Sequence, residues 1–247
     1  MLLEYWPLRR EGKISQPPKK GKIGRLGNVK EKNMAKRCLL VAALAALIAG
    51  GAFAESIFSA GGGLMFDGGR IGGVSGYGQS YDIDAFGFGA WVFADARFAE
   101  LAIGFIGGPA SMEGGAGFYP ISERGSFFAM DLSLLGKFPF AIGAGNISLF
   151  PLLGIGYTVM LTVGGDFDLG DSSATDLSTF RIQFGGGADF DISESIFIRT
   201  SLLGAWRFPS RFTRDVASDL NTYFGSTGVS ANGGFGVAVK VGVGFRF

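Results

Sequence analysis

The last fourteen residues of the chain alternate without exception between apolar side chains and small or charged side chains. Every second residue from Phe235 to Phe247 is Val or Phe, and the residues between them are Gly, Ala, Lys240 and Arg246. Successive side chains of a β-strand point to opposite faces, so this period of two predicts a strand with two chemically distinct faces.

The same alternation occurs along the preceding chain and predicts an all-β fold. It is clearest at 180–191, where Phe180, Ile182 and Phe184 share one face and Arg181, Gln183 and Gly185 the other. No convincing helical period interrupts it. With the last strand, the predicted set is eight strands, the others lying at 56–66, 83–95, 98–107, 126–138, 146–161, 180–191 and 195–208. Pro151 lies inside one of them and lacks an N–H donor, which predicts a bulge or a later strand start there.

The connections between these strands alternate in length. Three are short, at 96–97, 139–145 and 192–194, and four are long, at 67–82, 108–125, 162–178 and 209–233. Transmembrane barrels of even strand number have long extracellular loops, short periplasmic turns and both termini in the periplasm. The pattern therefore predicts an eight-stranded antiparallel up-and-down β-barrel.

The composition of the polar face decides which face points inward. A soluble barrel of the lipocalin kind would be apolar inside and dense in Lys and Glu outside. Here the polar face carries Gly, Ala and Ser between isolated charges, which suits the narrow lumen of an eight-stranded barrel. The apolar face is therefore expected to form a band ~25 Å tall against outer-membrane lipid.

The N-terminal region has a different character from the barrel. Residues 1–33 are predicted to be an over-extended or disordered basic leader, and 34–54 a signal peptide with an apolar run at 39–49 and cleavage after Ala54. That run is shorter than the ~20 residues needed to span a bilayer as a helix. The predicted barrel domain is therefore 55–247. It has no cysteine, because Cys38 lies in the signal segment.

Charge and residue usage exclude several functions. Of 22 Lys and Arg, 11 lie in residues 1–37, and of 21 acidic residues only three do, so the remainder carries 11 bases, 18 acids and a net charge of −7. Nucleic acid is therefore not expected as a partner. The chain contains no histidine to act as catalytic base or orienter. Neither an enzymatic activity nor a cofactor is predicted.

The inward face is expected to hold a network of opposite charges, because an isolated buried charge is unfavourable. Its predicted members are Asp95, Glu100, Asp131, Lys137, Arg181, Asp189, Arg199, Arg207, Lys240 and Arg246. Such a network would either plug the lumen or form the charge pairs of a narrow gated path. Apolar residues on the same face are the candidates for a constriction that selects solutes, namely Trp91, Phe93, Leu152 and Met160.

The long connection at 162–178 contains alternating carboxylates, Asp166, Asp168 and Asp171, close to Gly170. Oxygen ligands of this kind can hold Ca²⁺. The spacing lacks the full twelve-residue calcium-loop pattern, so the prediction is a solvated acidic loop, with a calcium site as the weaker alternative.

The C-terminal strand resembles the insertion signal of outer-membrane β-barrel proteins, which has a polar residue, a glycine two positions later and aromatics at the third-last and last positions. Here these are Lys240, Gly242, Phe245 and Phe247. The resemblance implies that the β-barrel assembly machinery recognises these four positions.

By size and strand pattern, 55–247 resembles the small eight-stranded families, which are OmpW with its relative OprG, OmpX and the OmpA transmembrane domain. The OmpW-type resemblance implies a narrow pore for small, largely apolar solutes. The long loops leave open a second function, a surface adhesin for host or matrix ligands or a structural protein without transport.

Overall fold

The computed structural model describes residues 58–96, 98–115, 121–142, 146–166, 172–225 and 228–247. The leader, the signal segment and the cleavage site at Ala54 lie outside these residues and remain predictions. The elements are β1 (Phe58–Gly76), β2 (Gln79–Ala96), β3 (Ala99–Gly114), β4 (Ile121–Lys137), β5 (Phe140–Ile142), β6 (Ile147–Gly165), η3 (Ala174–Leu177), β7 (Thr179–Asp191), β8 (Ile196–Arg207), α2 (Arg211–Phe224), β9 (Ser230–Asn232) and β10 (Gly234–Arg246).

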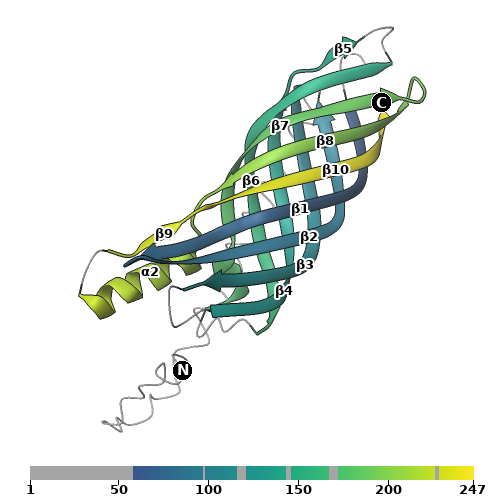
Figure 1. Cartoon of the computed structure of the whole chain (residues 1–247). Coiled ribbons are helices and arrows are strands. Elements are labelled where there is room, and N and C mark those ends of the chain that lie inside the picture. Colours follow the sequence, from purple (N-terminus) through teal and green to yellow (C-terminus); the bar gives the residue numbers. More distant parts are fainter. Residues whose placement is uncertain (1–57, 97, 116–120, 143–145, 167–171, 226–227) are drawn as a thin grey trace, which may run out of the picture. The chain divides into compact units, whose positions relative to one another are not determined.

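The long strands close into a ring (Figure 1). Each long strand is antiparallel to its neighbours, and β10 pairs with both β8 and β1. In the closing pair Lys240 lies opposite Met65, and Arg246 opposite Ser59. The short strands β5 and β9 only extend the edges of β6 and β1. The predicted eight-stranded antiparallel barrel is confirmed, because β1, β2, β3, β4, β6, β7, β8 and β10 form the ring.

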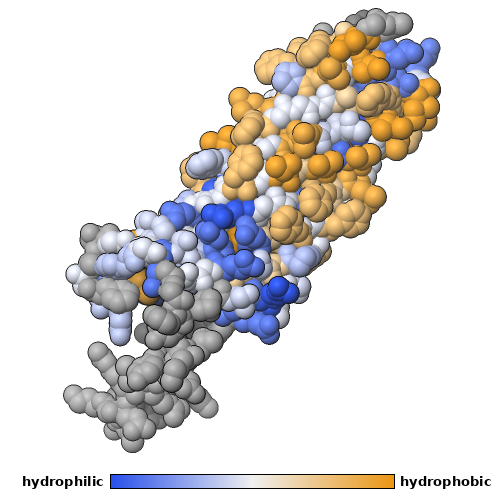
Figure 2. Space-filling model, viewed as in Figure 1, coloured by the Kyte–Doolittle hydropathy of each residue, from blue (hydrophilic) through white to orange (hydrophobic). Residues whose placement is uncertain are grey.

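The apolar face of the strands points outward. Along β10 the side chain of Val239 is 41% exposed, whereas that of its neighbour Lys240 is 1% exposed. Figure 2 shows the resulting apolar band on the face of the barrel that is in view, with hydrophilic side chains gathered towards the α2 end. Closure leaves no backbone edge unpaired in the ring, which is the condition for a sheet to cross hydrocarbon. The predicted assignment of the two faces is confirmed.

Several strands are longer than the alternation predicted. The predicted loop at 67–82 is wrong, since β1 and β2 continue through it to a two-residue turn at Tyr77 and Gly78. Both turn residues have positive φ, 53° and 74°, as a tight hairpin turn of this hand requires. The extensions are polar or glycine-rich on both faces, so the period of two is lost where the strands leave the apolar band. In the same way β3, β4 and β6 extend into predicted loops.

The predicted bulge or later strand start at Pro151 is wrong. The strand β6 begins at Ile147 and keeps its register with β7 through Pro151, which lies opposite Gly186. The neighbouring ladder is interrupted instead, because β4 ends at Lys137 and β5 begins at Phe140. Pro151 lies opposite that gap. A missing N–H donor on the side of β6 that faces the gap between β4 and β5 therefore breaks no ladder hydrogen bond.

A helix, α2, occupies the predicted loop at 209–233, where no helix was predicted. Ser210 caps it by accepting a hydrogen bond from the Thr213 N–H at 3.2 Å, and it ends at Gly225, which has φ 61°. The sequence carried the signal, since Phe212, Val216 and Leu220 recur every four residues. Within the described ranges, no helix is both long and apolar enough to cross a membrane.

Candidate functional site

Small residues on the inner face make room for large inward side chains. A methyl group at Gly187 would overlap the ring of Phe150. One at Gly236 would overlap the guanidinium of Arg207, and one at Gly156 would approach Arg181. The lumen is therefore filled by a few long side chains that lie against glycines across the sheet, as expected for a barrel of eight strands.

The first group of buried charges, which we name the loop-side cluster, consists of Asp67, Asp131, Arg181 and Arg207. It lies in the half of the barrel nearer α2. Arg181 Nη1 donates to Asp67 Oδ2 at 2.8 Å, and its Nη2 donates to Asp131. Arg207 donates to the other oxygen of Asp67 and to the backbone oxygen of Arg70. Two cations thus balance two carboxylates, and Asp67 is shared between both arginines.

Neutral side chains complete the hydrogen bonds of the loop-side cluster. The carboxylate of Asp131 accepts from the hydroxyls of Ser133 and Thr158, both at 3.2 Å. Gln183, with its carboxamide oxygen turned to Arg181, accepts from Nη2 and Nε at 3.0 and 3.1 Å and donates to Ser133. A buried polar network of this density is rigid only because its members are satisfied.

The second group, named the turn-side cluster, consists of Asp95, Glu100, Asp189, Lys137 and Arg199. Arg199 is its centre. It contacts Asp189 through two hydrogen bonds of 2.7 Å, Asp95 at 2.7 Å and Glu100 at 2.9 Å. Lys137 pairs with Asp95 and lies 3.6 Å from Asp189. Three carboxylates face two cations here, so this cluster has one excess negative charge.

Aromatic rings enclose the guanidinium of Arg199. Its central carbon lies 4.4 Å from the ring centroid of Phe93, 5.0 Å from that of Phe197 and 5.2 Å from that of Phe150. Cations are attracted to ring faces, and more strongly when both are desolvated. The rings therefore hold Arg199 in place while excluding water from its carboxylate partners.

Lys240 belongs to neither cluster. Its ammonium makes no hydrogen bond or ion pair with any residue in the described part of the chain, and it lies 5.1 Å from the ring centroid of Trp91. With Lys240 included, five bases match five acids in the lumen. Lys240 thus makes the numbers of buried bases and acids equal without pairing with any acid among the described residues.

Nine of the ten side chains predicted for the charge network are buried in the lumen. The exception is Arg246, which pairs at 2.6 Å with Asp191 at the turn-side rim, where the two side chains are 28% and 21% exposed. Sequence reasoning missed Asp67, because it was assigned to a loop. Its position two residues after the inward Met65 would have identified it.

The four residues predicted as a constriction do not form a single ring. Trp91 and Phe93 stack with centroids 4.8 Å apart and belong to the same apolar cluster as Met160. Leu152 packs in a different cluster, with Phe150 and Leu203. All four are buried inside the barrel, but they narrow the lumen at more than one place.

The loop-side mouth of the barrel is filled by apolar side chains from η3 and α2. Leu177 of η3 is buried against inward residues of the strand ends, and Phe212 of α2 packs against the same cluster. Ser178, just after η3, accepts a 3.0 Å hydrogen bond from the backbone N–H of Met160 and ties this segment to β6. Leu177 and Phe212 therefore cover inward apolar residues at the loop-side end of the barrel.

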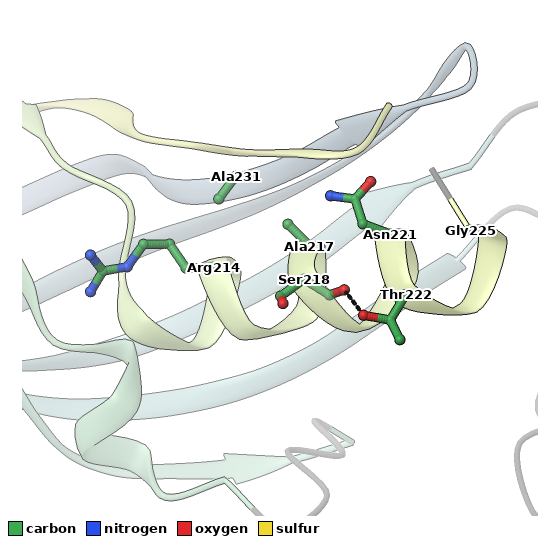
Figure 3. A pocket seen from close by; sticks show the side chains of 7 residues that line it. All are labelled: Arg214, Ala217, Ser218, Asn221, Thr222, Gly225 and Ala231. Atoms are coloured by element: carbon green, nitrogen blue, oxygen red, sulfur yellow. Dashed lines mark hydrogen bonds between the residues drawn. The ribbon is translucent and has the colours of Figure 1, made fainter. Parts of the chain in front are cut away.

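An open concavity of about 590 Å³ lies on α2, outside the lumen (Figure 3). Its lining includes Arg214, Ser218 and Asn221 of α2 and Ala231 of β9. Asn221 also joins α2 to the following segment, since it donates to the Val229 carbonyl at 2.8 Å and accepts from its N–H at 2.9 Å. No member of either ionic cluster lines this concavity.

Two other sequence predictions remain untested. Asp168 and Asp171 lie outside the described residues, whereas Asp166 lies within them; no cluster of potential metal ligands occurs among the residues that the structure places. In the predicted assembly signal, Lys240 and Gly242 face inward, Phe245 faces outward, and the Phe247 N–H donates to the Phe58 carbonyl at 3.0 Å. Recognition by the assembly machinery stays a prediction.

A closed ring of eight antiparallel strands, apolar outside and charged inside, defines an outer-membrane β-barrel protein. The sequence matches no family model and no curated protein.

Among solved structures, the chain is similar to OprG from Pseudomonas aeruginosa, with 12% identity over 77% of this chain and 95% of that one, and a TM-score of 0.43. It is also similar to Ail of Yersinia pestis (16% identity, 77% and 99%, TM-score 0.35) and to the translocator domain of NalP from Neisseria meningitidis (14%, 88% and 98%, 0.29). The assignment of the chain to outer-membrane β-barrel proteins rests on the ring of strands and its two faces.

Proposed function

We propose that this protein is a narrow channel for small solutes across the outer membrane, closed in the present conformation and without enzymatic activity. The observation that carries the proposal is the presence of two ion-paired clusters among the apolar side chains that fill the lumen. Buried ion pairs stabilise a fold no better than well-packed apolar residues of similar volume. The concentration of ion pairs along the barrel axis therefore favours a role in the passage of solutes through the lumen.

The pairing pattern suits a gate. Asp67 is shared by Arg181 and Arg207, and Asp95 by Lys137 and Arg199. A shared carboxylate lets one cation move away while the other still neutralises it, so opening need not strand a buried charge. Passage also requires the apolar plug of Leu177 and Phe212 to leave the mouth.

Arg181→Ala is expected to raise single-channel conductance several-fold over the wild-type protein. The change removes a guanidinium from the middle of the loop-side cluster and frees its two carboxylates to attract cations. Planar bilayer recordings on the refolded full chain measure the effect. Arg70→Ala is the matched control, because Arg70 pairs with Asp82 on the exposed extension. The conductance of this variant should equal that of the wild-type protein.

The channel proposal is lost if neither wild-type protein nor Arg181→Ala passes any small ion or solute in bilayers and liposome-swelling assays. Should Arg181→Ala fail to refold, Arg181→Lys keeps the charge, shortens the side chain and removes the bond to either Asp67 or Asp131. Because Arg181→Lys loses only one of the two ion pairs, its conductance should be higher than that of the wild-type protein.

A second candidate function is attachment to host or matrix ligands through the extracellular extension. The observation in its favour is that α2 packs on β1 and β9 beyond the apolar band, with Arg211, Arg214 and Asp215 exposed on its surface. Arg214→Glu should then reduce attachment of cells displaying the protein and leave bilayer conductance unchanged. Unchanged attachment would count against this candidate.

A further inference from the structure

Two hydrogen-bond donors in the middle of the lumen meet no acceptor among the residues that the structure describes. We propose that the Lys240 ammonium and the Trp91 indole N–H form a binding subsite for the carboxylate of a small apolar monocarboxylate. The inference deepens the proposed channel function by naming its solute class, and it rests on that function for its biological use.

Lys240 is the exception among the lumen cations. Lys137, Arg181, Arg199 and Arg207 all pair with carboxylates. The Lys240 ammonium, on a side chain 1% exposed, makes no ion pair or hydrogen bond with the residues that the structure describes. An ammonium buried in this way is costly unless it meets an anionic or polar acceptor.

Trp91 supplies the second donor. Its ring is stacked on Phe93 and lies 5.1 Å from the Lys240 ammonium. Its Nε1 is buried and has no hydrogen-bond partner within the described part of the chain, although a buried indole N–H usually finds one. The fixed ring orientation means that Trp91 cannot turn this donor towards another acceptor without losing the stack.

The chemistry of the surroundings selects the ligand. A carboxylate is acceptor-only and has two oxygens, so it can accept from both donors at once. Met65, Trp91 and Phe93 belong to one apolar cluster beside the donors and suit a short hydrocarbon body. Lys240 supplies one positive charge, and the neighbouring cations Arg181 and Arg199 are already paired with carboxylates, so a second ligand carboxylate would meet no further cation. A monocarboxylate therefore fits better than a dicarboxylate.

The fluorescence of Trp91 reports binding without any measurement of flux. Replacing the other two tryptophans, Trp6 and Trp206, by Phe leaves Trp91 as the single tryptophan of the full chain. This protein is refolded in detergent and titrated with butyrate and with butyramide, which has nearly the same shape but no charge. Butyrate should change the Trp91 emission saturably, with an affinity at least tenfold higher than that of butyramide.

Lys240→Met should abolish the response to butyrate, whereas Arg246→Met, which removes a rim cation, should preserve it. Heat-shifted mobility on denaturing gels checks that each variant is folded. If Lys240→Met does not fold, Lys240→Gln keeps a donor without the charge and should lose the preference for butyrate over butyramide.

Equal responses to butyrate and butyramide, no saturable response, or an unchanged response in a folded Lys240 variant would each overturn the subsite and leave water as the acceptor. If the protein binds butyrate but shows no conductance, the channel proposal is lost and the subsite stands. If it conducts but does not bind butyrate, the subsite is lost and the channel proposal stands.

Discussion

Arg199→Ala is expected to lower the free energy of unfolding by about 3–5 kcal/mol, the cost of breaking a buried ion pair by removing one partner. The change leaves Asp95, Glu100 and Asp189 in the turn-side cluster with only Lys137 to neutralise them. It also removes the cation enclosed by the rings of Phe93, Phe150 and Phe197. Among the described residues, no other side chain in the lumen contacts three carboxylates.

Urea unfolding of the refolded protein in lipid vesicles measures this loss. The matched control is Arg70→Ala, since the Arg70 side chain is 47% exposed and its pair with Asp82 should contribute at most about 1 kcal/mol. Adding Glu100→Gln to Arg199→Ala removes one of the stranded carboxylates and should recover part of the loss. If Arg199→Ala were as mild as Arg70→Ala, the turn-side cluster would not be the desolvated network described above.

Leu202→Arg is the second large expected effect, with a loss of about 2–4 kcal/mol in folding stability in a bilayer, the cost of an arginine at the midplane of a lipid-facing barrel surface. Leu202 lies in the middle of β8 and its side chain is 58% exposed on the outer face. In a water-soluble barrel the same substitution would place a charge in solvent and change stability by about 0.5 kcal/mol or less.

Ser218→Arg is the matched control for Leu202→Arg, because Ser218 is exposed on α2, in the polar part of the molecule. Folding into vesicles, followed by heat-shifted mobility, should be impaired for Leu202→Arg and normal for Ser218→Arg. Equal behaviour of the two variants would contradict the assignment of the outer face to lipid.

The alternation of side chains along the sequence was sufficient to predict the ring of strands, but not the segments that lie outside the apolar band. The period of two holds while one face meets lipid and the other meets the lumen. Beyond the apolar band that contrast ends, and the extensions of β1 and β2 past Asp67 were predicted as a loop. The helix α2 was missed for a different reason. Its four-residue spacing at Phe212, Val216 and Leu220 was present, but the segment was assigned to a loop between strands.

Backbone details near proline also depended on the neighbouring strand. A strand containing Pro151 was expected to bulge, because a closed barrel has no free edge. The structure accommodates the proline by interrupting the neighbouring ladder between Lys137 and Phe140. Nothing within 146–161 indicates this solution, because it depends on what lies opposite.

The sequence by itself determined that the protein is a barrel of eight strands, which face carries the charges, and that Lys240 points inward, because strand geometry places alternate side chains on opposite faces. Only the tertiary structure decided the pairing. Asp67 and Arg181 meet although 114 residues separate them, and Asp95 and Arg199 meet across 104. Those contacts depend on the stagger and closure of the whole sheet, which also leave Lys240 beside Trp91 and unpaired with any carboxylate that the structure places.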